Sequence, residues 1–224
     1  MSLESDLKQK VSDIFGEQWD VRKGQVVPSP DTVKLNNDSV KLTGVVMYAD
    51  MSESTKLVDT KKALFAAEIY KTFLHCAAKI IRSEGGEITA YDGDRIMAVF
   101  LGDHKNTSAT RAALKLNYAR NKIINPAIRH QYPNSTYYVN HTVGIDTSEI
   151  HVANTGIRGS KDLVWVGKAA NHAAKLCSLP NTHQTRITGT VYNKLTDNLK
   201  YTNGKSMWEQ RNWTDTGRTI YRSS

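Results

Sequence analysis

Two aspartates offer the clearest chemistry in this sequence, and each stands where an apolar run ends. Residues 45–55 begin apolar, reach Asp50 and then turn polar, which is typical of a buried strand followed by a helix. Residues 86–100 form two strand-like runs around an Asp-Gly turn, a strong hairpin signal that places Asp94 at the turn. Two carboxylates at the ends of neighbouring strands, beside a helix N-terminus, suit a divalent cation that carries phosphates.

The alternation of side chains along a strand brings further residues to this site. Because residues two apart share a face, Val46, Tyr48 and Asp50 are expected to point together. A helix N-terminus presents backbone amides to phosphate oxygens, and the amides expected here are those of Ser52, Glu53, Ser54 and Thr55. The same geometry also describes ordinary capping, and Asp50 alone could be a helix cap or Asp94 alone a turn residue.

Composition restricts the class of protein. The 224 residues carry a net charge of +8, which suits an anionic ligand, and the basic residues are scattered rather than clustered, so no nucleic-acid partner is expected. No apolar run approaches the roughly 18–20 residues that span a bilayer, and Ser2–Lys10 lacks the apolar core of a signal peptide. We therefore expect a cytoplasmic protein without a membrane partner, with Cys76 and Cys177 as free buried thiols.

The order of predicted elements indicates an α+β fold, a mostly antiparallel sheet with helices on one face. Apolar stripes at helical spacing predict a continuous helix over 54–83 and another over 106–124 that Pro126 ends. Two neighbouring strands are predicted at 137–146 and 149–154. The remaining expectations are helices at 3–19, 168–179 and 189–195 and extended segments at 44–51, 163–166, 185–188 and 219–222.

Four blocks of the sequence occur in the order found in a known enzyme family. They are residues 45–55, 93–100, 143–150 and 166–175. With Val-Gly-Ile-Asp-Thr-Ser-Glu-Ile in the third block and Val-Gly-Lys-Ala-Ala-Asn-His-Ala-Ala-Lys in the fourth, the chain resembles the class III nucleotide cyclases. The resemblance implies a ferredoxin-like catalytic domain over 44–224, preceded by an N-terminal helix and connector over 1–43.

The resemblance also implies a metal site and a homodimer. Asp50, Asp94 and the backbone carbonyl of Met51 correspond to the positions that hold two divalent cations, and oxygen-only ligation suits Mg²⁺ or Mn²⁺. Asn171 corresponds to the asparagine that positions the sugar or leaving-group region. Lys175 takes the place of an arginine that neutralises charge in the transition state, and it keeps the charge but loses the planar fork. In the family these two residues complete a site that the partner's aspartates begin.

The positions that contact a purine in adenylate and guanylate cyclases differ here. They are Ala90 and Val164, neither of which can hydrogen-bond a purine edge. If Gly-Asp forms the hairpin turn, Asp92 pairs with Arg95 and Ala90 with Met97, so that Arg95 projects toward the space beside Ala90. Together with the ring of Tyr48, this arginine favours a smaller base with carbonyl acceptors, a pyrimidine. A core role for Tyr48 and a solvated turn role for Arg95 are the plain alternatives.

This pattern resembles the bacterial pyrimidine cyclases of the Pycsar antiphage system. It implies synthesis of cyclic UMP or cyclic CMP from UTP or CTP, as a signal read by a separate effector protein in antiviral defence. Uracil has one more carbonyl than cytosine, so Arg95 favours UTP. Two alternatives stay open, an adenylate or guanylate cyclase with a rearranged base pocket and a non-catalytic nucleotide-binding module.

Overall fold

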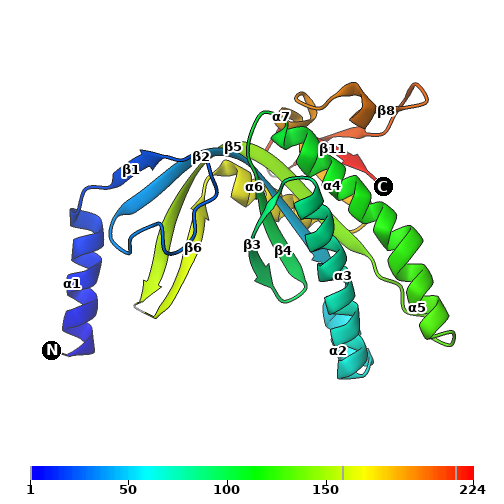
Figure 1. Ribbon diagram of the computed structural model, residues 1–224, viewed down its shortest axis with the longest axis horizontal. Helices are drawn as coiled ribbons and strands as arrows, with labels where there is room; N and C mark the ends of the chain where they lie inside the picture. The colour runs from blue at the N-terminus through cyan, green and yellow to red at the C-terminus, as the bar shows by residue number, and fades with distance from the viewer. Residues whose placement is uncertain (1, 158, 215) are drawn as a thin grey trace. The chain divides into compact units, whose positions relative to one another are not determined.

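The computed structural model describes residues 2–157, 159–214 and 216–224 (Figure 1). Contacts within the chain define two compact units, one of residues 1–43 and 149–167 and the other of residues 44–148 and 168–224. The predicted division into residues 1–43 and 44–224 does not coincide with these units, because the first unit also contains residues 149–167. That division therefore stays a prediction. None of the described helices combines the length and the hydrophobicity needed to cross a bilayer.

The described elements include both helices and strands along the whole chain. The helices are α1 (Leu3–Gly16), α2 (Ser54–Thr60), α3 (Ala63–Ser83), α4 (Lys105–Ala119), the π-helical turn η1 (Arg120–Ile124), α5 (Asn125–Gln131), α6 (Lys168–Cys177), α7 (Gly189–Tyr192) and the 3-10 turn η2 (Asp197–Leu199). The strands are β1 (Asp20–Lys23), β2 (Asp38–Met51), β3 (Glu87–Asp92), β4 (Arg95–Phe100), β5 (His141–Ile157), β6 (Ser160–Val166), β7 (Thr185–Thr188), β8 (Tyr201–Thr202), β9 (Lys205–Ser206), β10 (Glu209–Trp213) and β11 (Arg218–Ser223).

The sheet of the second unit is mostly antiparallel, which confirms the predicted α+β class. Its strands follow the order β10-β11-β7-β5-β2-β4-β3. The pairs β10–β11, β11–β7, β2–β4 and β3–β4 are antiparallel, whereas β5 and β7 run parallel.

One face of β2 packs into the main core of the second unit. Val45, Met47 and Ala49 are almost completely buried there, in one cluster with Phe73 of α3 and Leu116 of α4. Full burial of a large apolar side chain contributes roughly 1.5–3 kcal/mol, and a one-residue slip of the strand would expose the whole set. The core therefore fixes which β2 side chains face the other way, namely Val46, Tyr48 and Asp50.

Helix α6 departs from the expectation of helices on one face, because it packs against the opposite face of the sheet. A Cβ atom on Gly144 of β5 would stand 2.1 Å from the carbonyl oxygen of Ala173, so only glycine lets α6 approach this closely. The neighbours of Gly144 in the strand, Val143 and Ile145, belong to the main core on the other side. Helix α6 thus shares its face of the sheet with Tyr48 and Asp50.

The continuous helix predicted over 54–83 is wrong. Helix α2 ends at Thr60 and α3 begins at Ala63, with Lys61 and Lys62 in extended conformations between them. The four residues from Asp59 to Lys62 are all polar, so no apolar side chain links the stripe of α2 to that of α3. The break lets each helix direct its own apolar face to the core.

Pro126 does not end its helix, contrary to the prediction. It lies at the start of α5, directly after the π-helical turn η1, and the helix continues to Gln131. The amide of Asn125 donates to the carbonyl of Arg120, five residues back. This wider turn gives the proline ring, which donates no hydrogen bond, the room that a regular α-helical turn lacks.

The two strands predicted at 137–146 and 149–154 are one strand, β5, which continues through Ser148 and Glu149. Its hairpin partner is β6, with Ile157 opposite Ser160. Gly156 and Gly159, at the hairpin end, both adopt positive φ values, 101° and 89°. Gly156 and Gly159 were the turn signal in this part of the sequence. Ser148 and Glu149, where the prediction placed the reversal, have no comparable tendency to reverse the chain.

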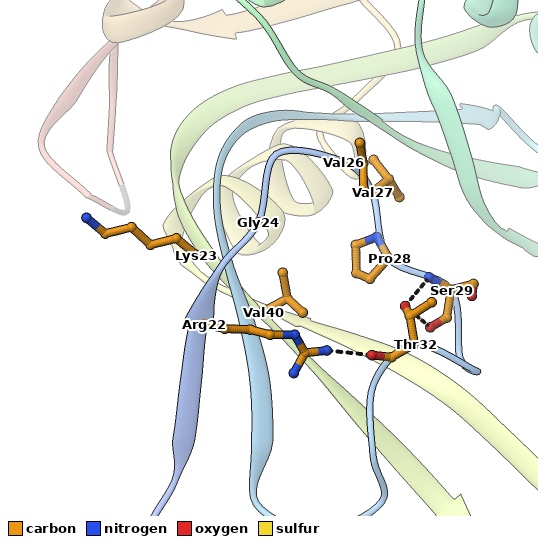
Figure 2. A pocket seen from close by; sticks show the side chains of 9 residues that line it. All are labelled: Arg22, Lys23, Gly24, Val26, Val27, Pro28, Ser29, Thr32 and Val40. Carbon is orange, nitrogen blue, oxygen red and sulfur yellow. Dashed lines mark hydrogen bonds between the residues drawn. The ribbon is translucent and has the colours of Figure 1, made fainter.

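The first unit holds α1, β1, the start of β2 and most of the β5–β6 hairpin. The predicted apolar stripe of α1 is solvent-exposed at Leu7, Val11 and Phe15. Figure 2 shows a pocket beside β1 in which Arg22 donates to the carbonyl of Thr32. None of the predicted site residues lines this pocket.

Candidate active site

Asp50, Asp94 and Arg95 come together at one end of the β2–β4 pair, and we call them the hairpin group. Asp50 and Arg95 are direct cross-strand partners, and Arg95 also pairs with Asp92 across the hairpin. Nη2 and Nε of Arg95 both donate to Oδ2 of Asp50, at 2.9 and 3.1 Å. Oδ2 of Asp94 is buried and has no hydrogen-bond partner in the described part of the chain. The predicted hairpin register, Asp92 with Arg95 and Ala90 with Met97, is confirmed.

Burial is the largest single influence on the pKa of Asp50 and on that of Arg95, but it sets the direction of the shift only for Asp50. It raises the pKa of Asp50 above its usual value, the Arg95 hydrogen bond opposes this rise, and the charges of Asp94 and Asp92 add to it. Burial disfavours the charge of Arg95, but the hydrogen bond and charge of Asp50 outweigh it, so that the pKa of Arg95 is raised. A carboxylate with two acidic neighbours is a centre to which a cation is attracted.

Residues 51–55 have different roles in the loop after β2. The side chain of Met51 is buried in the core, so only its backbone could reach a ligand. The amide of Ser52 donates to the carbonyl of Asn140 at 2.9 Å, which leaves it unable to donate to a phosphate. Glu53 adopts φ 61° before α2 begins at Ser54. The amides of Glu53, Ser54 and Thr55 as phosphate donors stay a prediction.

The residues predicted to surround the base divide between the two units. Tyr48 is half-buried opposite Met97, and burial raises the pKa of its hydroxyl. Ala90 is exposed on β3, after a bulge in the β3–β4 pairing, and also lies opposite Met97. Val164 is 39% exposed on β6 and belongs to the other unit, so its part in base recognition stays a prediction.

Asn171 and Lys175, which we call the helix pair, stand one turn apart on the exposed side of α6. The buried side of this helix consists of Ala169, Ala170, Ala173, Leu176 and Cys177. Neither side chain of the helix pair makes a hydrogen bond or an ion pair with a described residue. Both are therefore free to act on a molecule outside this chain.

The residues that hold α6 in place were not predicted from the sequence. His172, beside Asn171, lies with its Nδ1 atom 2.8 Å from Oδ2 of buried Asp146, while the hydroxyl of Thr188 donates to Oδ1 of the same carboxylate. The His172 ring also meets Trp213 edge to face. Asp146 lies within the third sequence block, but nothing in its spacing to His172 identified the pair.

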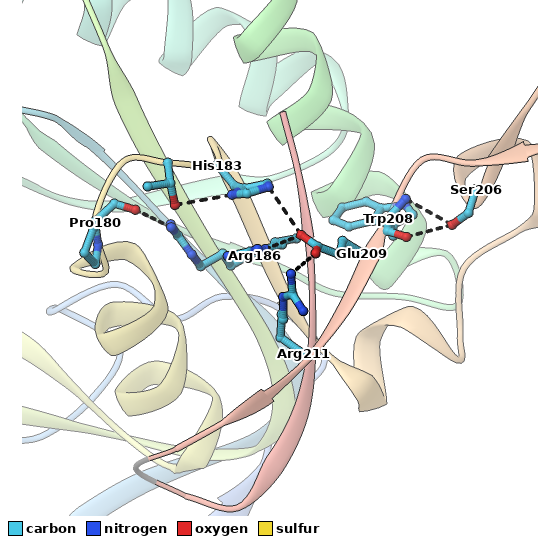
Figure 3. A network of polar contacts seen from close by, with 9 residues as sticks. Pro180, His183, Arg186, Ser206, Trp208, Glu209 and Arg211 are labelled. Atoms are coloured by element: carbon cyan, nitrogen blue, oxygen red, sulfur yellow. Dashed lines mark hydrogen bonds and ion pairs between the residues drawn. The ribbon is translucent and has the colours of Figure 1, made fainter.

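A pocket beside Asp50 is lined by two segments, Asp50–Glu53 and Cys177–Asn181, together with Thr142. Figure 3 shows how the second segment is anchored, with Arg186 reaching the carbonyl of Pro180. Arg186 is only 3% exposed, and burial, together with the charge of Arg222, lowers the pKa of its guanidinium. Arg222 in turn is paired with Glu209. A buried cation thus fixes the wall of the pocket that faces the loop after β2.

The hairpin group offers oxygen atoms that suit a divalent cation. The two hydrogen bonds from Arg95 end on Oδ2 of Asp50 and leave Oδ1 outside the ion pair, and Oδ2 of Asp94 lacks a partner. No set of three or more His, Cys, Asp or Glu side chains in the described ranges could enclose a metal ion. Two carboxylates with a backbone carbonyl form an incomplete site that a ligand's own oxygens would complete.

Comparisons with known proteins agree with this arrangement. The uridylate cyclase of Burkholderia cepacia is 52% identical over 226 residues, which cover 100% of this chain and 98% of that protein. The uridylate cyclase of Xanthomonas perforans is 50% identical over 226 residues, covering 100% and 97%. The crystal structure of the adenylyl cyclase CyaB from P. aeruginosa has a TM-score of 0.71 at 20% identity, over 83% of this chain and 95% of that one.

No protein-family model matches the chain. Identity of half or more over the full length of curated relatives nevertheless shows the family, and the likeness to CyaB shows the fold. The chain therefore belongs to the uridylate cyclase family of nucleotide cyclases, with the fold of a class III cyclase domain.

Proposed function

We propose that this protein is a uridylate cyclase that converts UTP to 3′,5′-cyclic UMP and pyrophosphate. The observation that carries the proposal is the pair of carboxylates, Asp50 and Asp94, at one end of the β2–β4 pair in a chain of this family. In the reaction the 3′-oxygen forms a bond to the α-phosphorus, the bond from that phosphorus to the β-phosphate bridging oxygen breaks, and the hydroxyl proton leaves. No protein nucleophile is needed, because positioning and charge stabilisation carry phosphoryl transfer.

Two divalent cations, Mn²⁺ or Mg²⁺, belong to this proposal. Oδ1 of Asp50, Oδ2 of Asp94 and the carbonyl of Met51 would hold them, and the unpartnered Oδ2 of Asp94 supports this assignment. When bound, such ions lower the pKa of the attacking hydroxyl and offset the charge of the triphosphate. The chain contributes the position of both carboxylates, which the β2–β4 register and the hairpin turn set.

The site is shared between two copies of the chain in this proposal. Asn171 and Lys175 are exposed and make no hydrogen bond or ion pair with the described residues of their own chain, which supports a role across a dimer interface. The ammonium group of Lys175 would offset charge on the α-phosphate, and the Asn171 amide would orient the ribose or the leaving group. A homodimer would then hold two equivalent sites.

Tyr48 is proposed to contact the uracil ring, and Arg95 a carbonyl of the base once it leaves Asp50. The half-buried position of Tyr48, on the same face as Asp50, supports the first assignment. The small side chains of Ala90 and Val164 leave the purine-reading positions without hydrogen-bonding groups. Cytoplasmic location, a separate effector that reads cyclic UMP, and a role in antiphage defence stay predictions.

The test is a competition between substrates. The protein is incubated with equal concentrations of ATP, GTP, CTP and UTP and with Mn²⁺, and the products are separated by mass spectrometry. We expect cyclic UMP in excess, and none from the Asp50→Asn variant. Cyclic CMP in excess would move the preference to cytosine, and a cyclic purine product would overturn the base assignment. Binding of UTP without any product would favour a nucleotide-binding module.

A further inference from the structure

The ion pair between Arg95 and Asp50 engages one of the two carboxylates to which the proposed function assigns cation binding. The pair is set by the backbone, since the two residues are direct partners in the β2–β4 register and their side chains stand on one face. Exposure of the side chains is 34% for Arg95 and 19% for Asp50. Both side chains are therefore partly accessible to solvent, the guanidinium more so than the carboxylate.

The geometry of the pair is one-sided. Nε and Nη2 of Arg95 both donate to Oδ2 of Asp50, whereas a fork-to-fork pair would engage both carboxylate oxygens. Oδ2 is consequently saturated, and Oδ1 stays outside the pair. No other hydrogen bond or ion pair joins Arg95 to the rest of the described chain. The guanidinium is thus held by one oxygen atom, which makes it exchangeable.

The charges around Arg95 explain why exchange would depend on a nucleotide. Arg95 is ion-paired with Asp50 and lies opposite Asp92 across the hairpin, so a second cation at Asp50 would stand close to Arg95 and be repelled by it. A triphosphate brings negative charge that offsets both cations and offers the guanidinium new acceptors. The site at Asp50 and Arg95 would then bind a cation together with a nucleotide more tightly than the cation alone.

We propose that Arg95 is an exchangeable counterion of Asp50 that couples cation binding to nucleotide binding. In the protein alone it occupies Oδ2 of Asp50 and weakens cation binding, and it releases this oxygen when a nucleotide enters. This inference rests on the proposed function, because it takes Asp50 as a cation ligand. Arg95 is accordingly a positioning residue that acts through Asp50, in addition to any contact with the base.

The experiment measures Mn²⁺ affinity by the loss of the free-ion signal in electron paramagnetic resonance. Wild type is compared with Arg95→Gln, with and without α,β-methylene UTP, which cannot be cyclised. We expect Arg95→Gln to bind Mn²⁺ alone about tenfold more tightly, because a repelling charge next to the site is gone. The analogue should strengthen Mn²⁺ binding less in this variant than in wild type.

Three further variants make the outcome decisive. Arg95→Lys keeps the charge and should restore weak Mn²⁺ binding, whereas Arg218→Gln removes an exposed arginine of β11 and should match wild type. Asp94→Asn should weaken Mn²⁺ binding in every background. If Arg95 only stabilised the hairpin, Arg95→Gln would lower the melting temperature and leave Mn²⁺ affinity unchanged, and this result would overturn the proposal. If Mn²⁺ and nucleotide binding were coupled through Arg95 but UTP gave no cyclic product, only the proposed function would be contradicted.

Discussion

The hairpin group and the helix pair lie in the same compact unit, yet their surroundings differ sharply. Asp50, Asp94 and Arg95 are half-buried and tied to each other by strand register and an ion pair. Asn171 and Lys175 stand on the exposed side of α6 without polar partners among the described residues. The first set is assembled by contacts within one chain, whereas the second makes no polar contact with the described part of its chain.

The fold positions the hairpin group and the helix pair in different ways. Register and core packing place the carboxylates close together, although their mutual repulsion and burial oppose this, and the pKa of Asp50 is raised as a result. Helix α6 is held against the sheet by the contact of His172 with Asp146 and by the close approach at Gly144, and neither contact uses Asn171 or Lys175. A second copy of the chain would supply what each set lacks.

The largest expected effect comes from the hairpin group. Asp94→Asn should lower cyclic UMP formation about a thousandfold, because one of the two negatively charged ligands of the proposed cations is lost. The assay is the initial rate with UTP and Mn²⁺, with circular dichroism to confirm folding. Asp92→Asn is the matched control, since Asp92 is exposed two residues away in the same hairpin and should lose less than tenfold. Equal losses in both variants would contradict the assignment of Asp94.

The second prediction tests whether the two sets meet across a dimer. Asp94→Asn and Asn171→Ala chains, each nearly inactive, are co-expressed with different tags. Random pairing makes half of the dimers mixed, and each mixed dimer has one intact site out of two, so about a quarter of wild-type activity should return.

The control for this experiment is the mixed dimer purified through both tags, which should reach about half of wild-type activity. Mixing two copies of chains that carry the same substitution should return nothing. If purified mixed dimers stayed inactive, the hairpin group and the helix pair would have to act within one chain, and the proposed shared site would be wrong.

Much of the hairpin group was predictable because local signals determine it. The apolar run of β2, its period of two and the Asp-Gly turn sufficed to place Asp50, Asp94 and Arg95 and to give the correct register. The ion pair from Arg95 to Asp50 was not predicted. It depends on the β2–β4 register, which joins residues 45 positions apart.

Elements that depend on tertiary context were harder to predict. The break between α2 and α3 and the π-helical turn before Pro126 reflect how separate helices meet the core, and neither follows from propensity alone. Helix α6 reaches the second face of the sheet through Gly144, whose role becomes visible only when Ala173 is seen above it. The anchoring contact of His172 with Asp146 joins residues 26 positions apart.

The smallest expected effect concerns the buried residue His141, whose neighbour Asn140 contacts the loop after β2. His141 follows Asn140, whose carbonyl accepts the Ser52 amide, and its ring lies 5.8 Å from that of Phe73 in the core. Burial, together with the charge of Arg120, lowers the pKa of His141 to about 3, and neither ring nitrogen has a partner in the described part of the chain. Folding therefore holds this imidazole neutral where the unfolded chain, with an ordinary pKa near 6.5, would bind a proton.

The sign of the pH effect follows from that difference. Between pH 6.5 and about 3 the unfolded state binds one more proton at His141 than the folded state, so stability is full above pH 6.5 and falls as the pH decreases. The loss is about 1.4 kcal/mol per pH unit, or roughly 2 kcal/mol at pH 5. Chemical denaturation gives the free energy of unfolding at pH 7 and at pH 5. The difference between these two values should be smaller by this amount in His141→Leu than in wild type. His130→Gln, at an exposed histidine of α5, should leave this difference in stability unchanged, and an equal change in both variants would mean that the packing around His141 does not exclude the proton.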